Sequence, residues 1–240
     1  MIKKQLIKNG IRIDGRKLDE LRPIEAKVGV LKKADGSALF RIGNTTAIAG
    51  VYGPRKVFPK HEEKAERAIL RTKYNMAPFS TETRNRPGVN RRSIEISYVT
   101  RQSLESVILL DEFPKTAIDV HIEVLQADAS TRCTGINAAA LALADAGIPM
   151  KDLIASCSAG IVEGNIVLDI AGKEDTTGDL DLPIAYYPRK RQITLLQMDG
   201  LAKSENVKKI IALAVKGAEE VYEKQKDALK KKYMIEEMEE

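Results

Sequence analysis

The stretch Leu125–Gly147 constrains the fold of this chain more than any other part of its sequence. The residues before it alternate at period two, which predicts a strand whose apolar face is formed by Ile118, Val120, Ile122 and Val124. A short polar turn follows, and then a helical run that ends at Gly147 and Pro149. The apolar stripe expected on this helix contains Ile136, Ala139, Ala140, Leu143 and Ala144. A strand, a turn and a helix N-terminus form a common anion site, because free backbone N–H groups and the helix dipole both favour negative charge there.

The polar turn carries further donors for an anion. Ser130 and Thr131 supply hydroxyl groups, and Arg132 supplies a planar guanidinium that can hold a phosphate through two hydrogen bonds. The alternative is that Ser130 or Thr131 caps the helix and that Arg132 is solvated. Because helix caps are far commoner than phosphate sites, the spacing alone favours this alternative.

Composition limits the kind of protein that this chain can be. The 240 residues are 43% hydrophobic, which excludes a disordered chain and is enough for a substantial core. No apolar run approaches the roughly 18 residues of a membrane span, and the N-terminus lacks the apolar region of a signal peptide, so we expect a cytoplasmic protein without a membrane partner. Two histidines and two cysteines make a zinc site, a catalytic triad or a disulfide framework improbable. The net charge of +5 is a modest bias towards polyanionic partners.

The order of elements predicts an α+β fold. The first three strands should form an antiparallel meander, and the charged segment 55–68 reads as a surface loop. A long amphipathic helix should begin at Ser204. Because each half runs through strands, a helix, strands and a helix, we predict a single domain over residues 1–240 with internal two-fold character, a polar extension at 1–23 and a charged tail at 230–240 that frays. The expected strands are Ile24–Leu31, Ser37–Ile42, Thr45–Val51, Arg71–Ala77, Ile154–Val162, Ile166–Ile170, Leu182–Tyr187 and Gln192–Met198.

A basic loop precedes the first predicted helix. Residues 80–92 contain Pro, Gly and four arginines but no aromatic residue, and these arginines are Arg84, Arg86, Arg91 and Arg92. Such a loop suits contacts with a phosphate backbone better than base stacking, although a solvated loop is an equal alternative. The helix should span Ser93–Leu110, with a stripe formed by Ile94, Tyr98, Arg101, Leu104 and Ile108. The arginine pair 91–92 would then lie where the helix dipole disfavours cations, which favours a functional reason for it.

Two carboxylates form a second candidate site. Asp175 and Asp181 flank Gly178 in the polar loop 171–181 and lead into a strand. Paired carboxylates can serve as a general acid and as ligands of a divalent cation such as Mg²⁺ or Mn²⁺, although an acidic loop alone is usually solvated surface. The polar turn with Ser130, Thr131 and Arg132 is called the anion turn below, and the basic loop 80–92 the arginine loop. Together with these two segments, the carboxylates would suit phosphoryl transfer on a nucleic acid chain.

Several longer motifs make this chain resemble the RNase PH family, and within it the catalytic RNase-PH-type subunits of the archaeal exosome. The resemblance runs across almost the whole chain. The motifs that carry it are Leu125–Asp128 before the turn, Ala140–Met150, Ile11–Arg16, Leu21–Pro23, Tyr52–Pro54, Met76–Ser80, Pro188–Lys190 and Gln197–Gly200.

The resemblance implies a fold and a reaction. The fold would be the RNase PH fold, of the ribosomal protein S5 domain 2-like type, with mixed sheets packed against helices. The reaction would be processive 3′→5′ phosphorolysis of single-stranded RNA, with inorganic phosphate as co-substrate and nucleoside 5′-diphosphates as products. Ser130, Thr131 and Arg132 would hold the phosphate, although the family often has glycine where this chain has Ser130. Asp181 would be the general acid at the leaving 3′ oxygen, and Asp175 would support it or help to bind a divalent metal.

The resemblance also implies partners. Arg91 and Arg92 would grip the backbone of the RNA, with Arg84 and Arg86 as weaker candidates, and Lys60 with His61 would line the pore where RNA enters. Three copies of the chain would alternate with three copies of a related non-catalytic subunit in a hexameric ring that carries RNA-binding cap subunits.

Two alternatives stay open within the family. One is a stand-alone RNase PH that trims tRNA 3′ ends, against which the opening Ile11–Arg16 and the long C-terminal helix argue. The other is a non-catalytic subunit that guides RNA. Such subunits tend to lack the arginine of the turn and the two carboxylates, whereas this chain has Arg132, Asp175 and Asp181.

Overall fold

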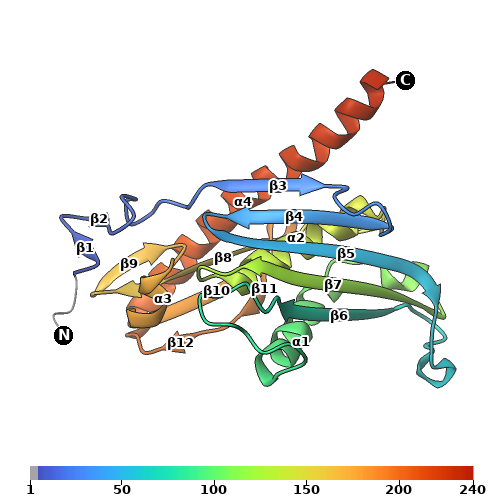
Figure 1. The fold of residues 1–240 in the computed structure, drawn as a ribbon, viewed down its shortest axis with the longest axis horizontal. Coiled ribbons are helices and arrows are strands. Elements are labelled where there is room, and N and C mark those ends of the chain that lie inside the picture. The colour runs from blue at the N-terminus through green and yellow to red at the C-terminus, as the bar shows by residue number, and fades with distance from the viewer. Residues whose placement is uncertain (1–4, 240) are drawn as a thin grey trace.

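The computed structural model describes residues 5–239, and its two large sheets lie on either side of a central helix (Figure 1). The first sheet has the order β3-β4-β5-β7-β6, and it contains β3 (Ile24–Val28), β4 (Gly36–Ile42), β5 (Thr45–Lys56), β6 (Ile69–Met76) and β7 (Thr116–Gln126). The predicted antiparallel meander is confirmed in β3, β4 and β5. β6 instead runs parallel to β7, because the chain between them crosses over through α1 (Arg91–Glu105) and a short 3-10 turn at Leu110–Glu112.

The second sheet is antiparallel and has the order β11-β10-β8-β9. Its strands are β8 (Ala155–Val162), β9 (Asn165–Leu168), β10 (Leu180–Tyr187) and β11 (Gln192–Leu196), and the short β12 (Asp199–Gly200) also pairs with β10. The predicted hairpin between β8 and β9 is confirmed. Its turn places Glu163 and Gly164 in the left-handed region, with φ of 48° and 76°.

Helix α2 (Thr131–Asp145) packs against β4, β5 and β7 of the first sheet and β8 and β10 of the second. The strand, turn and helix predicted over this region are confirmed, but the predicted single apolar stripe is too narrow, because α2 is buried on nearly every side. Small residues permit this double contact: a Cβ atom on Gly36 of β4 would lie 2.4 Å from the Ala142 carbonyl oxygen of the helix. Buried hydrophobic side chains from both halves of the chain form one continuous cluster around α2.

Helix α4 (Ser204–Glu239) packs on β8, β3 and β10. Tyr222 donates a hydrogen bond of 2.8 Å to Asp152, and Gln225 donates one of 3.1 Å to the Ile154 carbonyl. The helix continues to Glu239, so the tail predicted to fray is helical as far as the structure describes it, and residue 240 lies outside the described residues. None of the helices within residues 5–239 is long and apolar enough to cross a membrane.

The N-terminal extension differs from its prediction. It forms a small hairpin of β1 (Ile7–Lys8) and β2 (Ile11–Arg12), and all three of its arginines, Arg12, Arg16 and Arg22, are buried. The predicted polar loop 171–181 likewise contains a short helix, α3 (Lys173–Thr177). Both differences have one cause: Asp169 and Glu174 neutralise the arginines, and these partners lie about 150 residues away in sequence.

Helix α1 also differs from its prediction, which placed it at Ser93–Leu110. It begins two residues earlier because Asn90 is the N-cap: its side chain accepts from the Ser93 N–H at 2.8 Å, and the Ser93 hydroxyl accepts from the Asn90 N–H at 3.0 Å. Its predicted stripe is largely wrong, because Ile94 and Tyr98 are exposed whereas the buried face contains Ser93, Ile96, Thr100, Ser103 and Leu104. The charged segment 55–68 is mostly a surface loop as predicted, with one 3-10 turn at Lys60–Glu62, and a last such turn lies at Pro188–Lys190.

Candidate active site

The turn before α2 has an unusual backbone conformation. Ala129 and Ser130 both lie in the left-handed region, with φ of 62° and 52°. Ser130 occupies the N-cap position but its side chain makes no capping hydrogen bond, so the alternative that this turn is an ordinary helix cap is wrong. The Ser130 hydroxyl instead donates to the Ile170 carbonyl at 3.0 Å and lies 3.1 Å from the Ser158 hydroxyl. The turn is therefore fastened to the second sheet, and the first turn of α2 keeps its backbone N–H groups for another partner.

Two side chains of this turn have unused donors. The Thr131 hydroxyl oxygen and the Arg132 Nε are buried, and neither makes a hydrogen bond of normal geometry within the described part of the chain. The other end of the Arg132 guanidinium lies 3.5 Å from a Glu95 carboxylate oxygen, and that carboxylate also accepts a hydrogen bond of 2.5 Å from Gln197. The Thr131 hydroxyl lies beside the Tyr74 hydroxyl, whereas the Arg132 Nε has no such neighbour among the described residues. A buried donor without a partner is costly, so the Arg132 Nε in particular points to a ligand.

The two carboxylates lie at the start of β10 and in α3. Asp181 sits opposite Gly160 of β8 on one side and Asp199 of β12 on the other. Burial raises the pKa of Asp181 to about 7, with further repulsion from Asp175, while Arg132 opposes this shift. Its Oδ1 is buried without a hydrogen-bond partner among the described residues. A carboxyl group with a pKa near neutrality can hold and release a proton under physiological conditions.

The structure brings the predicted carboxylates and arginines together. Partial loss of surrounding water raises the pKa of Asp175, and Arg92 is close enough to oppose that shift, just as Arg132 does for Asp181. Arg92 and its neighbour Arg91 are exposed in the first turn of α1. The anion turn, the carboxylates and the start of α1 thus form one charged centre from three segments far apart in sequence.

The arginine loop adjoins this centre at its first residues. The Ala127 N–H donates to the Ser80 carbonyl at 2.8 Å, which holds the start of the loop beside the anion turn. Arg84 and Arg86 are exposed further along this loop. Within residues 5–239, no hydrogen bond or ion pair joins Arg84 or Arg86 to the two carboxylates.

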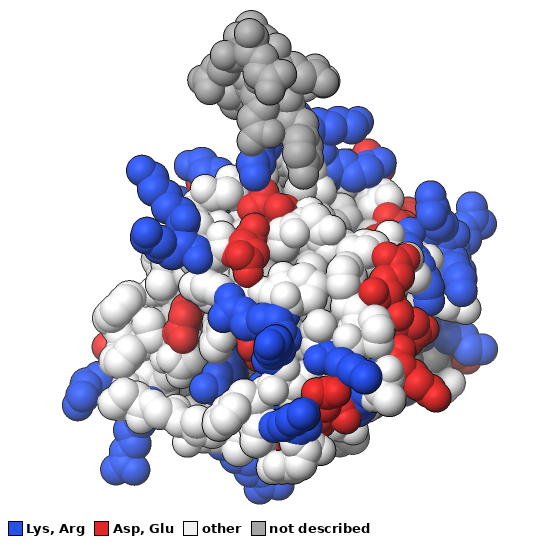
Figure 2. Space-filling view, turned by 90° about the vertical axis from the view of Figure 1, so that its right-hand side faces the viewer, with Lys and Arg blue, Asp and Glu red and all other residues white. Residues whose placement is uncertain are grey.

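Lys60 and His61 lie elsewhere. They belong to the connection between β5 and β6, which is at the opposite end of the molecule from α3 (Figure 1). This end carries Lys and Arg side chains interspersed with Asp and Glu, and not a continuous basic surface (Figure 2). Both residues are exposed. The structure therefore does not bring them to the charged centre.

Residue-by-residue reasoning missed three neighbours of the site. Asp199 faces Asp181 across the β10–β12 pair, and Glu95 contacts Arg132. The Tyr74 hydroxyl is buried beside Thr131, and burial raises its pKa. Asp199 lies in a motif that supported the resemblance, but nothing in the spacing pairs it with Asp181. Glu95 and Tyr74 gave no signal in the sequence.

Asp175 and Asp181 are compatible with a divalent cation. No group of three or more His, Cys, Asp or Glu within residues 5–239 is arranged to hold a metal ion. Mg²⁺ nevertheless often binds through one or two carboxylates together with substrate phosphates. The repulsion that Asp175 exerts on Asp181 is the kind of interaction that a cation between them would relieve.

Comparisons with known proteins cover most of the chain. Residues 20–149 match domain 1 of the 3′ exoribonuclease family (RNase PH), and residues 152–217 match domain 2. Exosome complex component Rrp41 of Pyrococcus furiosus is 59% identical over 231 residues, which cover 96% of this chain and 92% of that protein. The component of the same name from Methanopyrus kandleri is 53% identical over 225 residues, which cover 94% of each protein.

Two solved structures have the same fold. Rice (Oryza sativa) Rrp46 superposes with a TM-score of 0.82 at 26% identity, covering 91% of this chain and 100% of that one. The Archaeoglobus fulgidus exosome with RNA bound to the active site superposes with a TM-score of 0.79 at 25% identity, covering 90% and 93%. These likenesses confirm the fold that the sequence motifs implied.

Proposed function

Because this chain belongs to the 3′ exoribonuclease family (RNase PH), we propose that it is the catalytic subunit of an exosome ring that shortens single-stranded RNA. As a member of that family it is a phosphate-dependent 3′→5′ exoribonuclease. The assignment of the centre rests on three buried polar atoms that lie close together and make no hydrogen bond of normal geometry within residues 5–239. They are the Thr131 hydroxyl oxygen, the Arg132 Nε and the Asp181 Oδ1. The donors suit an anion, and the carboxyl group suits proton transfer.

The proposed mechanism transfers one phosphoryl linkage. Ser130 forms the turn, and Thr131 and Arg132 bind inorganic phosphate together with the N–H groups of α2. A phosphate oxygen attacks the phosphorus of the terminal linkage, and the bond between that phosphorus and the 3′ oxygen breaks. Asp181 gives its proton to the departing 3′ oxygen, so the products are a nucleoside 5′-diphosphate and an RNA one nucleotide shorter. The reverse reaction would extend RNA from diphosphates.

Asp175 has a supporting part in this proposal. It raises the pKa of Asp181 by repulsion and so keeps the acid protonated before the reaction. When a divalent metal is bound, Asp175 would hold it, with Asp181 as a second ligand only in its deprotonated form, and the metal would supply positive charge for the phosphates.

The proposed partners rest on surface chemistry and on the named relatives. Apolar side chains are exposed on neighbouring elements α1 and β11, and they include Ile94, Tyr98, Ile193 and Leu196. Such a surface suits a related ring subunit in a three-plus-three hexamer, and cap subunits would bind that ring. Lys60 and His61 would lie at the pore of the ring, at the far end from the centre. A cytoplasmic location and a single domain over residues 1–240 are further parts of this proposal.

The products of the reaction test the proposed function. With radioactive inorganic phosphate and an unlabelled single-stranded RNA, the assembled enzyme should release nucleoside diphosphates that carry the label in their terminal phosphate. Chromatography separates these products from monophosphates. Unlabelled nucleoside monophosphates released at an undiminished rate would mean that water is the nucleophile, and the assignment of the anion turn would be wrong.

The grip on RNA is tested separately through Arg91 and Arg92. Each phosphate contacted on a single strand adds a salt slope of roughly −0.7, so Arg91→Ala/Arg92→Ala should flatten the slope by about 1.4. The loss should be similar for different RNA sequences, because contacts to phosphate carry no base information. Binding titrations at several salt concentrations measure the slope. The matched control is Lys208→Ala/Lys209→Ala on the exposed part of α4, which makes the same change in net charge and should leave the slope unchanged.

Two outcomes would contradict this assignment of Arg91 and Arg92. An unchanged slope with full affinity would mean that the pair is only solvated. Loss of the ring in the variant would place the arginines at a subunit interface instead.

A further inference from the structure

The N-terminal segment contributes three buried arginines, Arg12, Arg16 and Arg22, which form an arginine cluster around Asp169 and Glu174. The Arg12 guanidinium forms a two-pronged ion pair with Glu174 and donates to the carbonyls of Leu168 and Asp169. A buried ion network is weak evidence for stability, because apolar side chains of similar size would usually hold the segment at least as well. The network instead provides geometric precision, because each planar guanidinium group holds its backbone carbonyls at defined distances and angles.

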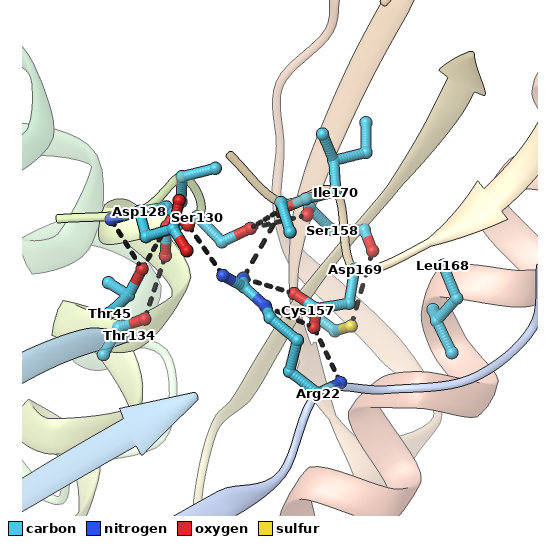
Figure 3. Close-up of polar contacts among 12 residues, drawn as sticks. Arg22, Thr45, Asp128, Ser130, Thr134, Cys157, Ser158, Leu168, Asp169 and Ile170 are labelled. Atoms are coloured by element: carbon cyan, nitrogen blue, oxygen red, sulfur yellow. Dashed lines mark hydrogen bonds and ion pairs between the residues drawn. The ribbon is translucent and has the colours of Figure 1, made fainter. Parts of the chain in front are cut away.

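Arg22 has the most consequential contacts of the cluster. It grips the Asp169 carboxylate with two hydrogen bonds, of 2.8 Å from Nε and 2.6 Å from Nη2, and its backbone N–H adds a third at 3.0 Å. Its remaining nitrogen, Nη1, donates to the Asp128 carbonyl at 2.6 Å (Figure 3). One side chain therefore joins the segment that leads into α3 to the residue two positions before Ser130.

The two segments that Arg22 joins both have strained backbones. Ala129 and Ser130 are left-handed in one, and Asp169 is left-handed in the other, with φ of 51°. Such conformations cost non-glycine residues free energy and persist only where the surroundings hold them. Ser130 adds a second link between the same segments through its hydrogen bond to Ile170 (Figure 3).

We infer that Arg22 is a positioning residue for the reaction: it sets the anion turn at a fixed place relative to the carboxylates of α3 and β10. This inference rests on the proposed function of the turn as the phosphate site. Arg22 touches no reacting atom in this scheme. Burial raises the pKa of Asp175, and the charge of Arg22 opposes that rise, so Arg22 lies near this carboxylate as well as the turn.

Arg22→Lys tests the inference in the assembled enzyme. Lysine keeps the positive charge but cannot hold Asp169 with a fork and the Asp128 carbonyl at the same time. The KM for phosphate should rise by about 10-fold or more, the effect of losing one charge-assisted hydrogen bond that orders the site. The KM for RNA should stay within about twofold, because the proposed RNA contacts lie on α1. A merely structural loss would lower kcat through a smaller active fraction and leave both KM values unchanged.

Arg16→Lys is the matched control. Arg16 is as buried as Arg22 and also donates to Asp169, to its carboxylate at 3.3 Å and its carbonyl at 3.2 Å. Its other contacts are with Asp14 and the Glu20 carbonyl and not with the anion turn. Its KM for phosphate should remain within about twofold of the unsubstituted enzyme, because the link to the turn is intact.

Each outcome decides the inference. An unchanged KM for phosphate in an assembled Arg22→Lys enzyme overturns it, and so does an equal rise in the Arg16→Lys control. If Arg22→Lys does not assemble, Arg22→Gln is measured in the same way, and failure of both makes Arg22 a folding residue and overturns the inference. If the unsubstituted enzyme cleaves RNA without phosphate, the proposed function fails instead, which distinguishes the two.

Discussion

Asp181→Asn is expected to lower kcat by about 10²–10⁴, the usual contribution of a general acid. Asparagine has nearly the same shape and keeps a polar group between β8 and β12, so the fold should be preserved. It cannot give up a proton to the departing 3′ oxygen. RNA affinity should stay nearly unchanged, because the proposed RNA contacts are on α1. Single-turnover rates and binding titrations of the assembled enzyme measure the two effects separately.

A pH profile adds a second readout for Asp181. The pKa of this group is about 7, above the ordinary value of 3.8, so the protonated form needed for donation predominates below pH 7. The part of kcat that depends on this proton should therefore be fully present at low pH and be lost as the pH rises through about 7. The Asn variant should lack this fall. Asp179→Asn is the matched control, because Asp179 is exposed two residues away and faces Gly164 instead of the centre.

Turnover near that of the unsubstituted enzyme in the Asp181→Asn ring would show that another group, or water, supplies the proton. A loss of the same size in Asp179→Asn would show that the loop and not the acid is sensitive to substitution. An Asn variant that keeps the fall near pH 7 would assign that fall to a different group.

The part of the fold that the sequence predicts is the part whose signals are local. β7 and α2 follow from apolar residues at period two and then at helical spacing, with Gly147 as the stop. The meander of β3, β4 and β5 follows from turns at 35–36 and 43–44. Local patterns do not say which strands lie side by side, and the parallel pairing of β6 with β7 was not predictable from them.

The errors concern interactions between distant residues. Arg12 and Glu174 are 162 positions apart, so a polar N-terminal extension and a polar acidic loop each read as surface when considered alone. The error in α1 is of a different kind, because the Asn90 cap is a local signal that the prediction passed over in favour of Ser93. The predicted buried stripe of α1 was also wrong, because Ile94 and Tyr98 are apolar but exposed. Exposed apolar side chains of this kind are expected where another subunit binds.

The candidate site was predictable as a set of residue types but not as an arrangement. The motifs and the family resemblance predicted Ser130, Thr131, Arg132, Asp175 and Asp181 as site residues. The structure brings these residues close together, and their roles stay predictions. The sequence did not show which side chains of the turn form hydrogen bonds within the protein and which do not. The Ser130 hydroxyl donates to the Ile170 carbonyl, whereas the Thr131 hydroxyl and the Arg132 Nε make no hydrogen bond of normal geometry with the part of the chain that the structure describes.

The buried donors of Thr131 and Arg132 lead to a prediction about inorganic phosphate as the co-substrate. Removing inorganic phosphate from the buffer should stop the release of nucleotides, and restoring phosphate should recover it. In the proposed mechanism inorganic phosphate, bound at the anion turn, is the nucleophile. Without phosphate, an excess of nucleoside diphosphate should extend the RNA instead. Gel analysis of a labelled RNA follows both directions. Shortening that continues at full rate in phosphate-free buffer would overturn the proposed chemistry.

Arg132→Ala should reproduce much of the effect of removing phosphate. Its guanidinium is the one group of the turn that brings a full positive charge, and loss of such a preorganised donor typically costs about 10²–10³ in rate. The loss should appear in kcat/KM for phosphate, with Arg132→Lys between the two because lysine restores charge without the fork. Arg55→Ala, which removes an exposed arginine at the far end of β5, should change kcat/KM for phosphate by less than about twofold. If Arg132→Ala keeps its kcat/KM for phosphate, the ion pair with Glu95 is the whole role of this arginine, and the phosphate must be held elsewhere in the centre.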